Sequence, residues 1–426
     1  MMKPVDPQGR VGHKEAQKIR AAAEIFPAPM GAWTTNGCAH DAFRGFSWKH
    51  PFVGARLVRA LSGVWRTLAS GVDKPRPYKG SGCRAFSWPR IPAAWIGLSA
   101  LLVVPAFAQR IEISWPTPNP AWERGRDFES WVQPTVSGNP TSGLWGSVRS
   151  SGTQFHEGID IKPVGRDRNG EATDPVMAAM DGVVRHINPR AGDSSYGRYV
   201  VLEHPGVSPG VYTLYAHLAR IEPGLAPGAR VERGQRLGLM GRSAGGYAIP
   251  KDRAHLHFEI GLRLTDDFSS WYAWRKFGSP NQHGLWNGMN LMGVNPRDFL
   301  EQWRGRRVDN FAQYFTRLDS AVRVRVVTTR VPDFIRRYPA LLRKPVDGIV
   351  GGWEVQCDVT GLPFAWTPLS TSEVAGKRPG TVEIVSVDQA ALRSFRGKSL
   401  VVTRNGRPSP GSDLNTMLQL VFGLRQ

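Results

Sequence analysis

Cysteine is scarce in this chain, which has only three among its 426 residues: Cys38, Cys83 and Cys357. A framework of several disulfides is therefore excluded as the source of its stability. Cys38 and Cys83 also precede the cleavage point predicted below, so only Cys357 would remain in the mature chain and no intrachain disulfide could form. No cysteine follows the cleavage point directly, which argues against a lipoprotein.

Acidic residues are also few, since 35 Asp and Glu stand against 55 Lys and Arg, for a formal net charge of +20. A basic surface favours polyanions such as nucleic acid, anionic lipid or the bacterial cell wall, although it also serves solubility alone. No motif interleaves aromatic and basic residues for base recognition, so we predict no nucleic-acid partner.

Long apolar runs are missing with one exception, residues 91–108. This uncharged run follows basic residues and ends in Ala106-Phe107-Ala108, a small-residue cleavage pattern before Gln109. Its apolar centre is too short for a comfortable membrane span. These features predict a secretory signal peptide, hence export to the periplasm or outside and only transient membrane contact. A single-span anchor is the alternative.

Signal peptides stand at the N-terminus of a chain, yet residues 1–90 precede this one. Residues 1–70 are rich in Gly, Pro, Trp and Arg and show no sustained periodicity. We interpret residues 1–90 as an extension that is either disordered or not translated. In the second case, translation begins near Val72.

Short apolar runs separated by glycine turns fill the stretch from 153 to 262, a pattern typical of an all-β sandwich or barrel. The predicted strands are 182–187, 199–203, 211–215 and 256–260. Residues 109–130 form a Pro- and Trp-rich lead-in, and a domain is predicted at 131–304 with an aromatic insertion at 263–293. That insertion could be a lid, a substrate wall or a surface loop packed by its own aromatics.

Beyond residue 304 the pattern changes. Residues 322–326 alternate like a half-exposed strand, and apolar residues between Leu414 and Phe422 repeat at helical spacing, with Ser412 and Asp413 as candidate caps. We predict a second, mixed α/β domain at 305–426, of unknown role, which could bind cell-wall or division proteins.

Histidines and one carboxylate recur at metal-ligand spacing. His156 and Asp160 share a face if their segment is extended, and so do His255, His257 and Glu259. Thr213, Tyr215 and His217 would likewise share a face. The candidate site residues are therefore His156, Asp160, His217, His255 and His257. Imidazoles with one carboxylate suit Zn²⁺, and three protein ligands leave a fourth position open, as in catalytic sites.

The same segments resemble the lysostaphin/LytM-type zinc metallopeptidases over roughly residues 131–300. The residues from Phe155 to Ile161 are similar to the first metal motif of that family, and those from His255 to Ile260 are similar to the last. Between them, the matching segments are 175–184, 196–202, 212–218, 228–235 and 237–241. The stretch between Gly241 and His255 and the insertion at 263–293 depart from the family pattern.

This resemblance implies a mainly β, barrel-like LytM fold with a duplicated hybrid motif, one zinc ion, and cleavage of the cross-links or stem peptides of bacterial peptidoglycan. It implies His156, Asp160 and His257 as zinc ligands and His217 and His255 as catalytic histidines, without saying which is the base. Two alternatives are a catalytically silent regulator of a cell-wall amidase and a zinc-binding protein without hydrolytic activity. The first predicts missing site residues, whereas all five are present.

Overall fold

The computed structural model describes residues 109–425. The predicted signal peptide and the extension at 1–90 lie outside the described residues. The described residues belong to one compact unit. None of the helices formed by residues 109–425 is long and apolar enough to cross a membrane.

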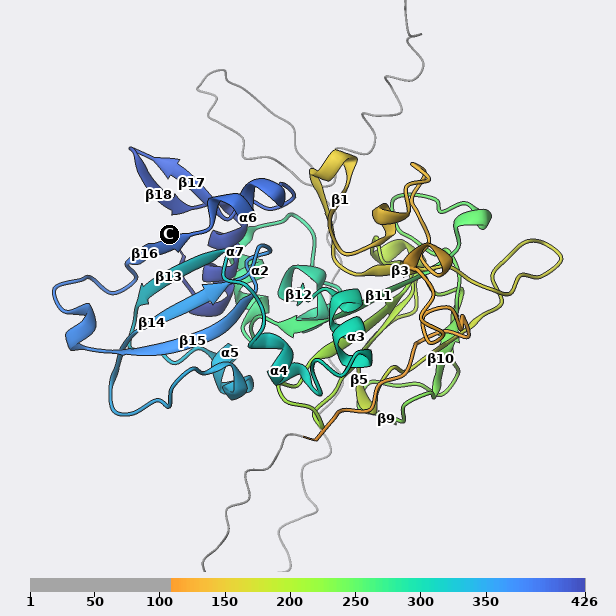
Figure 1. Cartoon of the computed structure of the whole chain (residues 1–426), viewed down its shortest axis with the longest axis horizontal. Coiled ribbons are helices and arrows are strands. Elements are labelled where there is room, and N and C mark those ends of the chain that lie inside the picture. The colour runs from red at the N-terminus through yellow and green to blue at the C-terminus, as the bar shows by residue number, and fades with distance from the viewer. Residues whose placement is uncertain (1–108, 426) are drawn as a thin grey trace, which may run out of the picture. The chain divides into compact units, whose positions relative to one another are not determined.

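The largest sheet has seven antiparallel strands in the order β12-β11-β7-β6-β5-β9, with β3 also paired to β11 (Figure 1). Its strands are β3 (Ile159–Ile161), β5 (Gly182–Asn188), β6 (Tyr199–Glu203), β7 (Tyr212–Ala216), β9 (Arg230–Val231), β11 (Leu256–Arg263) and β12 (Leu291–Gly293). The mainly β fold class is confirmed, and the four strands predicted between 182 and 260 correspond to β5, β6, β7 and β11.

Two smaller sheets lie in the same half of the chain. One is the antiparallel hairpin of β1 (Gly146–Arg149) and β2 (Gln154–His156). The other has the order β4-β10-β8 and contains β4 (Pro175–Met177), β8 (Arg220–Ile221) and β10 (Arg236–Leu239). The hairpin carries His156 but shares no ladder with the seven-stranded sheet.

Strand β11 is buried along its whole length, so both faces of the sheet are covered. Phe258 and Ile260 join the main hydrophobic cluster, as the alternation predicts. Leu214 and Ala216 of β7 pack into a second cluster on the opposite face. The face of β11 that carries His257 and Glu259 is therefore a polar strip lying beside that second cluster.

The prediction that Thr213, Tyr215 and His217 share a face is wrong. Tyr215 pairs with Phe258 and Thr213 with Ile260, which places both on the core face. His217 comes after the end of β7 and has a positive φ of 61°. Because this left-handed backbone ends the alternation of the strand, His217 reaches the other face.

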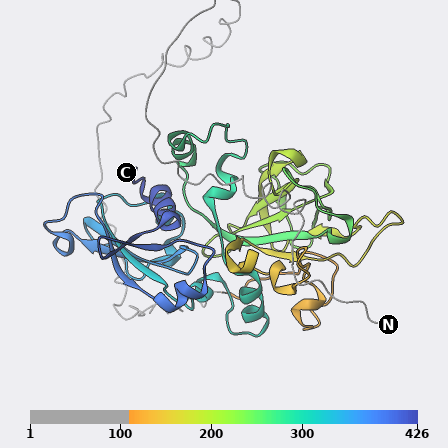
Figure 2. The same cartoon turned by 90° about the horizontal axis from the view of Figure 1, so that it is seen from above.

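A four-stranded antiparallel sheet of order β15-β14-β13-β16 forms after residue 304 (Figure 2). It consists of β13 (Val322–Val327), β14 (Val350–Cys357), β15 (Pro363–Ser370) and β16 (Val382–Val387), and β17 (Val401–Arg404) pairs with β18 (Arg407–Pro410). The predicted strand at 322–326 is β13, whose valines are buried between half-buried arginines.

The described helices are short. They are α2 (Phe268–Arg275), α3 (Pro296–Arg304), α4 (Phe311–Phe315), α5 (Asp333–Arg337), α6 (Gln389–Ser394) and α7 (Ser412–Phe422). Helix α7 is the one predicted from apolar spacing, but its N-cap is Gly411 and no side chain caps it. Asp413 instead accepts a hydrogen bond from the backbone N–H of Ser399.

The lead-in at 109–130 is packed into the core. Trp115 stacks on Trp122 with ring centroids 5.1 Å apart and meets Trp131 edge-on at 5.2 Å. All three indoles are buried. This segment is therefore part of the packed structure.

The insertion at 263–293 contains α2 and ends in β12, which pairs with β11. Its own aromatics pack together, since Tyr272 and Phe277 lie 4.7 Å apart. Trp271 also donates a hydrogen bond to Gln419 of α7. The insertion is thus bound to the sheet and to the C-terminal helix.

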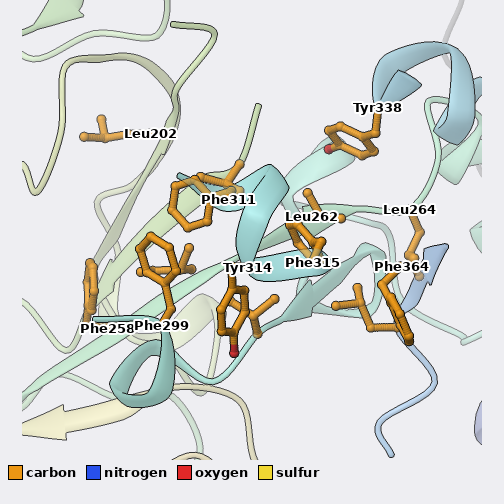
Figure 3. Close-up of a cluster of buried hydrophobic side chains, with 14 of the residues drawn as sticks. Leu202, Phe258, Leu262, Leu264, Phe299, Phe311, Tyr314, Phe315, Tyr338 and Phe364 are labelled. Carbon is orange, nitrogen blue, oxygen red and sulfur yellow. The ribbon is translucent and has the colours of Figure 1, made fainter. Parts of the chain in front are cut away.

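One hydrophobic cluster runs through both halves of the described chain (Figure 3). Phe258 of β11 and Phe299 of α3 belong to it, together with Phe311 of α4 and Phe364 of β15. The boundaries predicted at 130/131 and 304/305 stay predictions.

Candidate metal centre and its two flanking histidines

Three predicted residues converge on one point. His156 Nε2 lies 3.0 Å from His257 Nδ1, and each of these nitrogens lies 3.1 Å from Asp160 Oδ1. The register of β3 on β11 sets Asp160 directly beside His257, and His156 comes from the end of β2. All three side chains are buried. They form the one group with metal-binding geometry found in residues 109–425.

In His156 and His257, the ring nitrogen that faces away from the centre has a hydrogen-bond partner of its own. The nitrogen that faces the centre is therefore available to bind a cation. His156 Nδ1 lies 2.7 Å from the carbonyl oxygen of Leu144, and His257 Nε2 lies 2.9 Å from Glu259 Oε1. Each of these nitrogens can donate its proton to that oxygen, so the opposite nitrogen, once deprotonated, presents a lone pair to the centre. Tetrahedral zinc with bonds of about 2.0–2.1 Å separates its ligand atoms by about 3.3 Å, which the observed spacing approaches. The donor set therefore fits zinc.

The electrostatics of the three side chains also favour a cation. Burial lowers the pKa of His156 to about 4, so its imidazole is neutral at neutral pH. Burial opposes the charge on Asp160, but His156, His255 and Arg149 together hold its pKa well below the usual value. Burial likewise opposes the charge on His257, yet hydrogen bonds to Asp160 and Glu259 raise its pKa to about 9. Without a cation, His257 carries a proton that metal binding would displace.

The second oxygen of Asp160 is held by an arginine. Arg149 of β1 places Nη2 2.5 Å from Asp160 Oδ2, and its Nε donates to the carbonyl oxygen of Ser142 at 3.0 Å. This ion pair fixes the rotation of the carboxylate and leaves Oδ1 for the centre.

Two further predicted histidines flank the group. The rings of His217 and His255 lie 4.7 Å apart, and His255 Nε2 is 3.5 Å from Asp160 Oδ1. His217 Nδ1 lies 2.8 Å from the carbonyl oxygen of Ser243, and His255 Nδ1 lies 2.8 Å from that of Arg253. Since Nδ1 donates in both rings, both Nε2 atoms are proton acceptors.

Burial lowers the pKa of both flanking histidines, and His217 is lowered further by His255 and His257. Both rings are therefore neutral at neutral pH. A neutral ring with a free Nε2 is ready to accept a proton.

A loop holds the acceptor of His217 in place. Ser243 Oγ accepts from the backbone N–H of Arg198 and donates to the carbonyl oxygen of Leu218, each at 2.8 Å. Gly197 makes this approach possible, because a Cβ there would lie 2.1 Å from Ser243 O. The backbone N–H of His217 also donates to Tyr196 O at 2.9 Å.

Glu259 is a residue to which sequence reasoning gave no role. It is buried, and besides His257 it accepts hydrogen bonds from Tyr196 at 2.6 Å and Tyr212 at 2.8 Å. Its place two residues after His257 on a strand was a usable signal. Arg149 and Ser243 had no such signal, because they come from segments without periodicity.

Glu157 and His204 lie outside the centre. Glu157 is exposed next to buried His156. His204 is buried with Nδ1 2.8 Å from Asp181 O and Nε2 2.7 Å from Thr213 Oγ1.

Comparison with solved structures finds several partial matches. The lytM protein of Ruminococcus gnavus is 25% identical, over 35% of this chain and 47% of that one, with a TM-score of 0.24. The catalytic domain of lysostaphin from Staphylococcus simulans is 20% identical, over 37% and 87%, with a TM-score of 0.23. A zinc-containing peptidase from Vibrio cholerae is 23% identical, over 35% and 33%, with a TM-score of 0.20.

The chain thus spans about half of the length of the Ruminococcus gnavus protein and a third of the length of the Vibrio cholerae peptidase. No curated protein matches it. The model of peptidase family M23 matches residues 154–266, a range that includes His156, Asp160, His217, His255 and His257. Over residues 154–266, this chain is therefore similar to peptidase family M23.

Proposed function

We propose that this protein is an exported, zinc-dependent endopeptidase that hydrolyses peptide bonds in the cross-links or stem peptides of bacterial peptidoglycan. The observation that carries the proposal is the convergence of three ligand atoms within 3.1 Å of one another beside two neutral histidines. The family M23 domain supports peptidase chemistry. The sequence resemblance, the predicted signal peptide and the basic charge support the substrate class and the location.

His156, Asp160 and His257 would hold the zinc ion. Bound there, zinc would polarise a peptide carbonyl and make an attacking water more acidic. Arg149 and Glu259 keep Asp160 and His257 in their ligating orientations through the hydrogen bonds described above.

His217 and His255 would act on protons. Each presents an unprotonated Nε2 to the space beside the ligands, so one can accept the proton of the attacking water. Once protonated, a histidine can return that proton to the leaving amine or donate a hydrogen bond to the developing oxyanion. Burial favours the neutral form of both histidines before the reaction begins.

The test is digestion of purified cross-linked peptidoglycan, with the products analysed by mass spectrometry. We expect loss of cross-linked fragments that a zinc chelator abolishes and added zinc restores. A His217→Ala variant should bind zinc normally but cleave at least about 100-fold more slowly. His283→Ala, a histidine outside the centre, serves as the matched control.

Two results would contradict the proposal. Absence of cleavage by a folded, zinc-loaded protein would favour a regulatory role. Wild-type activity in His217→Ala would remove that histidine from the mechanism.

A further inference from the structure

The hairpin of β1 and β2 has little support of its own. It is a separate two-stranded sheet of seven strand residues, and a two-stranded hairpin is at best marginally stable in water. Its turn is strained, because Ser150 and Ser151 both adopt positive φ values, 49° and 57°. Yet this hairpin delivers His156 and Arg149 to the centre. Contacts with other parts of the chain must therefore stabilise the hairpin.

The support comes from about 240 residues further along the chain, just after α6. The N–H of Gly397 donates to Ser147 Oγ at 2.8 Å, and Arg396 donates to the carbonyl oxygen of Ser151 at 3.3 Å. Lys398 places its ammonium 4.5 Å from the ring centre of Phe155. The segment 395–398, here called the C-terminal clamp, thus contacts both strands and the turn.

Phe395 is the centre of this contact. Its ring lies 5.7 Å from Trp145 and 5.8 Å from Phe155, and these two rings lie 5.5 Å apart. A Cβ on Gly146 would come within 3.3 Å of Phe395, so the ring packs closely against the strand backbone. The three aromatic rings form a small cluster between the clamp and the hairpin.

The residues that Phe395 touches are chain neighbours of the groups that orient His156. Phe155 directly precedes His156. Trp145 directly follows Leu144, whose carbonyl oxygen accepts the Nδ1 proton of His156. Gly146 is the partner of His156 in the strand register. Movement of the aromatic cluster would therefore displace both the imidazole and its acceptor.

We propose that the C-terminal clamp is a positioning element of the metal centre, with Phe395 as its main residue, so that residues after 304 set the affinity of the centre for zinc. This inference rests on the proposed function, since it takes zinc as the cation bound by His156, Asp160 and His257. It assigns to part of the region 305–426 a role in assembling the centre.

The experiment is a zinc competition titration of the metal-depleted full chain against a chromophoric chelator. We expect Phe395→Ala to weaken zinc binding by about tenfold, the lower end of the effect of groups that orient metal ligands. Phe395→Trp, which keeps an aromatic ring, should restore most of the affinity. Ser147→Ala, which removes the acceptor of Gly397 without altering the aromatic cluster, should weaken binding to a smaller extent.

Leu392→Ala is the matched control, because it removes apolar packing from α6 but leaves Phe395 in place. Equal loss of affinity in Leu392→Ala and Phe395→Ala would overturn the proposal, because general destabilisation would then explain both. Unchanged affinity in a folded Phe395→Ala would also overturn it while leaving the proposed function intact. A wild-type chain that binds no zinc would overturn both.

Discussion

His257 is oriented from both sides of its ring. Nδ1 faces His156 and Asp160, and Nε2 donates to Glu259, which is itself fixed by two tyrosines. A carboxylate behind a ligating imidazole selects the tautomer and makes the ring a better donor to the metal. Glu259 is therefore part of the centre although it is not one of the three candidate metal ligands.

Replacing Glu259 by glutamine should weaken zinc binding by about tenfold, because the hydrogen bond to His257 loses its charge while the shape of the side chain is kept. Competition titration of the metal-depleted variant measures this. Glu232→Gln, at an exposed position, is the control. Equal affinities in the wild type and Glu259→Gln would show that Glu259 only fills space.

His204 should make stability depend on pH. Burial lowers its pKa to about 4 from the ordinary 6.5, so between these values the unfolded chain binds a proton that the folded chain does not. Its contribution is fully present above pH 6.5 and is lost as pH falls, by up to about 3 kcal/mol near pH 4.

Denaturant unfolding of the wild type and of His204→Gln at several pH values tests this expectation. The unfolding free energy of the wild type should fall more steeply between pH 6.5 and 4 than that of the variant. If the unfolding free energies of the wild type and of His204→Gln changed equally with pH, His204 would have the same pKa in the folded and unfolded chain.

The sequence was sufficient to bring the five histidine and aspartate candidates together, because each stands in a short motif on or beside a strand. It was insufficient for Arg149 and Ser243, because neither the short strand β1 nor the loop of Ser243 shows a periodic pattern. Both residues reach the centre through tertiary contacts. His217 reaches the centre because of a positive φ after the end of β7, which the alternation pattern does not predict.

At the scale of the secondary-structure elements, the centre depends on the close approach of β3 to β11. Gly158 stands between His156 and Asp160, and a Cβ at this position would lie 2.3 Å from the carbonyl oxygen of Phe258. The two strands can lie this close only because residue 158 has no side chain. Strand alternation predicts which residues face the core, but not how close two backbones come.

Gly158→Ala should lower the free energy of unfolding by about 1–3 kcal/mol through overpacking, and should also weaken zinc binding by displacing its neighbours. Denaturant titration and metal competition measure the two effects. Gly192→Ala is the control, because a Cβ there meets no atom within 4 Å. A Gly158→Ala protein as stable as Gly192→Ala would contradict this account of the strand packing.

At the scale of the whole molecule, the fold of the half that carries the candidate metal centre was predictable, whereas its contacts with the rest of the chain were not. The sequence predicts an extended lead-in and an insertion that could be a lid, a substrate wall or a surface loop. In the structure, Trp115, Trp122 and Trp271 of these segments are buried. Contacts between residues hundreds of positions apart, such as Phe395 with Trp145, leave no periodic trace. The role that we propose for the C-terminal region therefore rests on contacts that only the structure reveals.

The central claim is that His156, Asp160 and His257 hold one zinc ion. Anomalous diffraction at the zinc absorption edge, from crystals of the zinc-loaded protein, tests it most directly. We predict one strong peak at about 2.0–2.2 Å from His156 Nε2, Asp160 Oδ1 and His257 Nδ1. A peak bonded to other residues, or no peak at these three atoms in a zinc-loaded crystal, would contradict the claim.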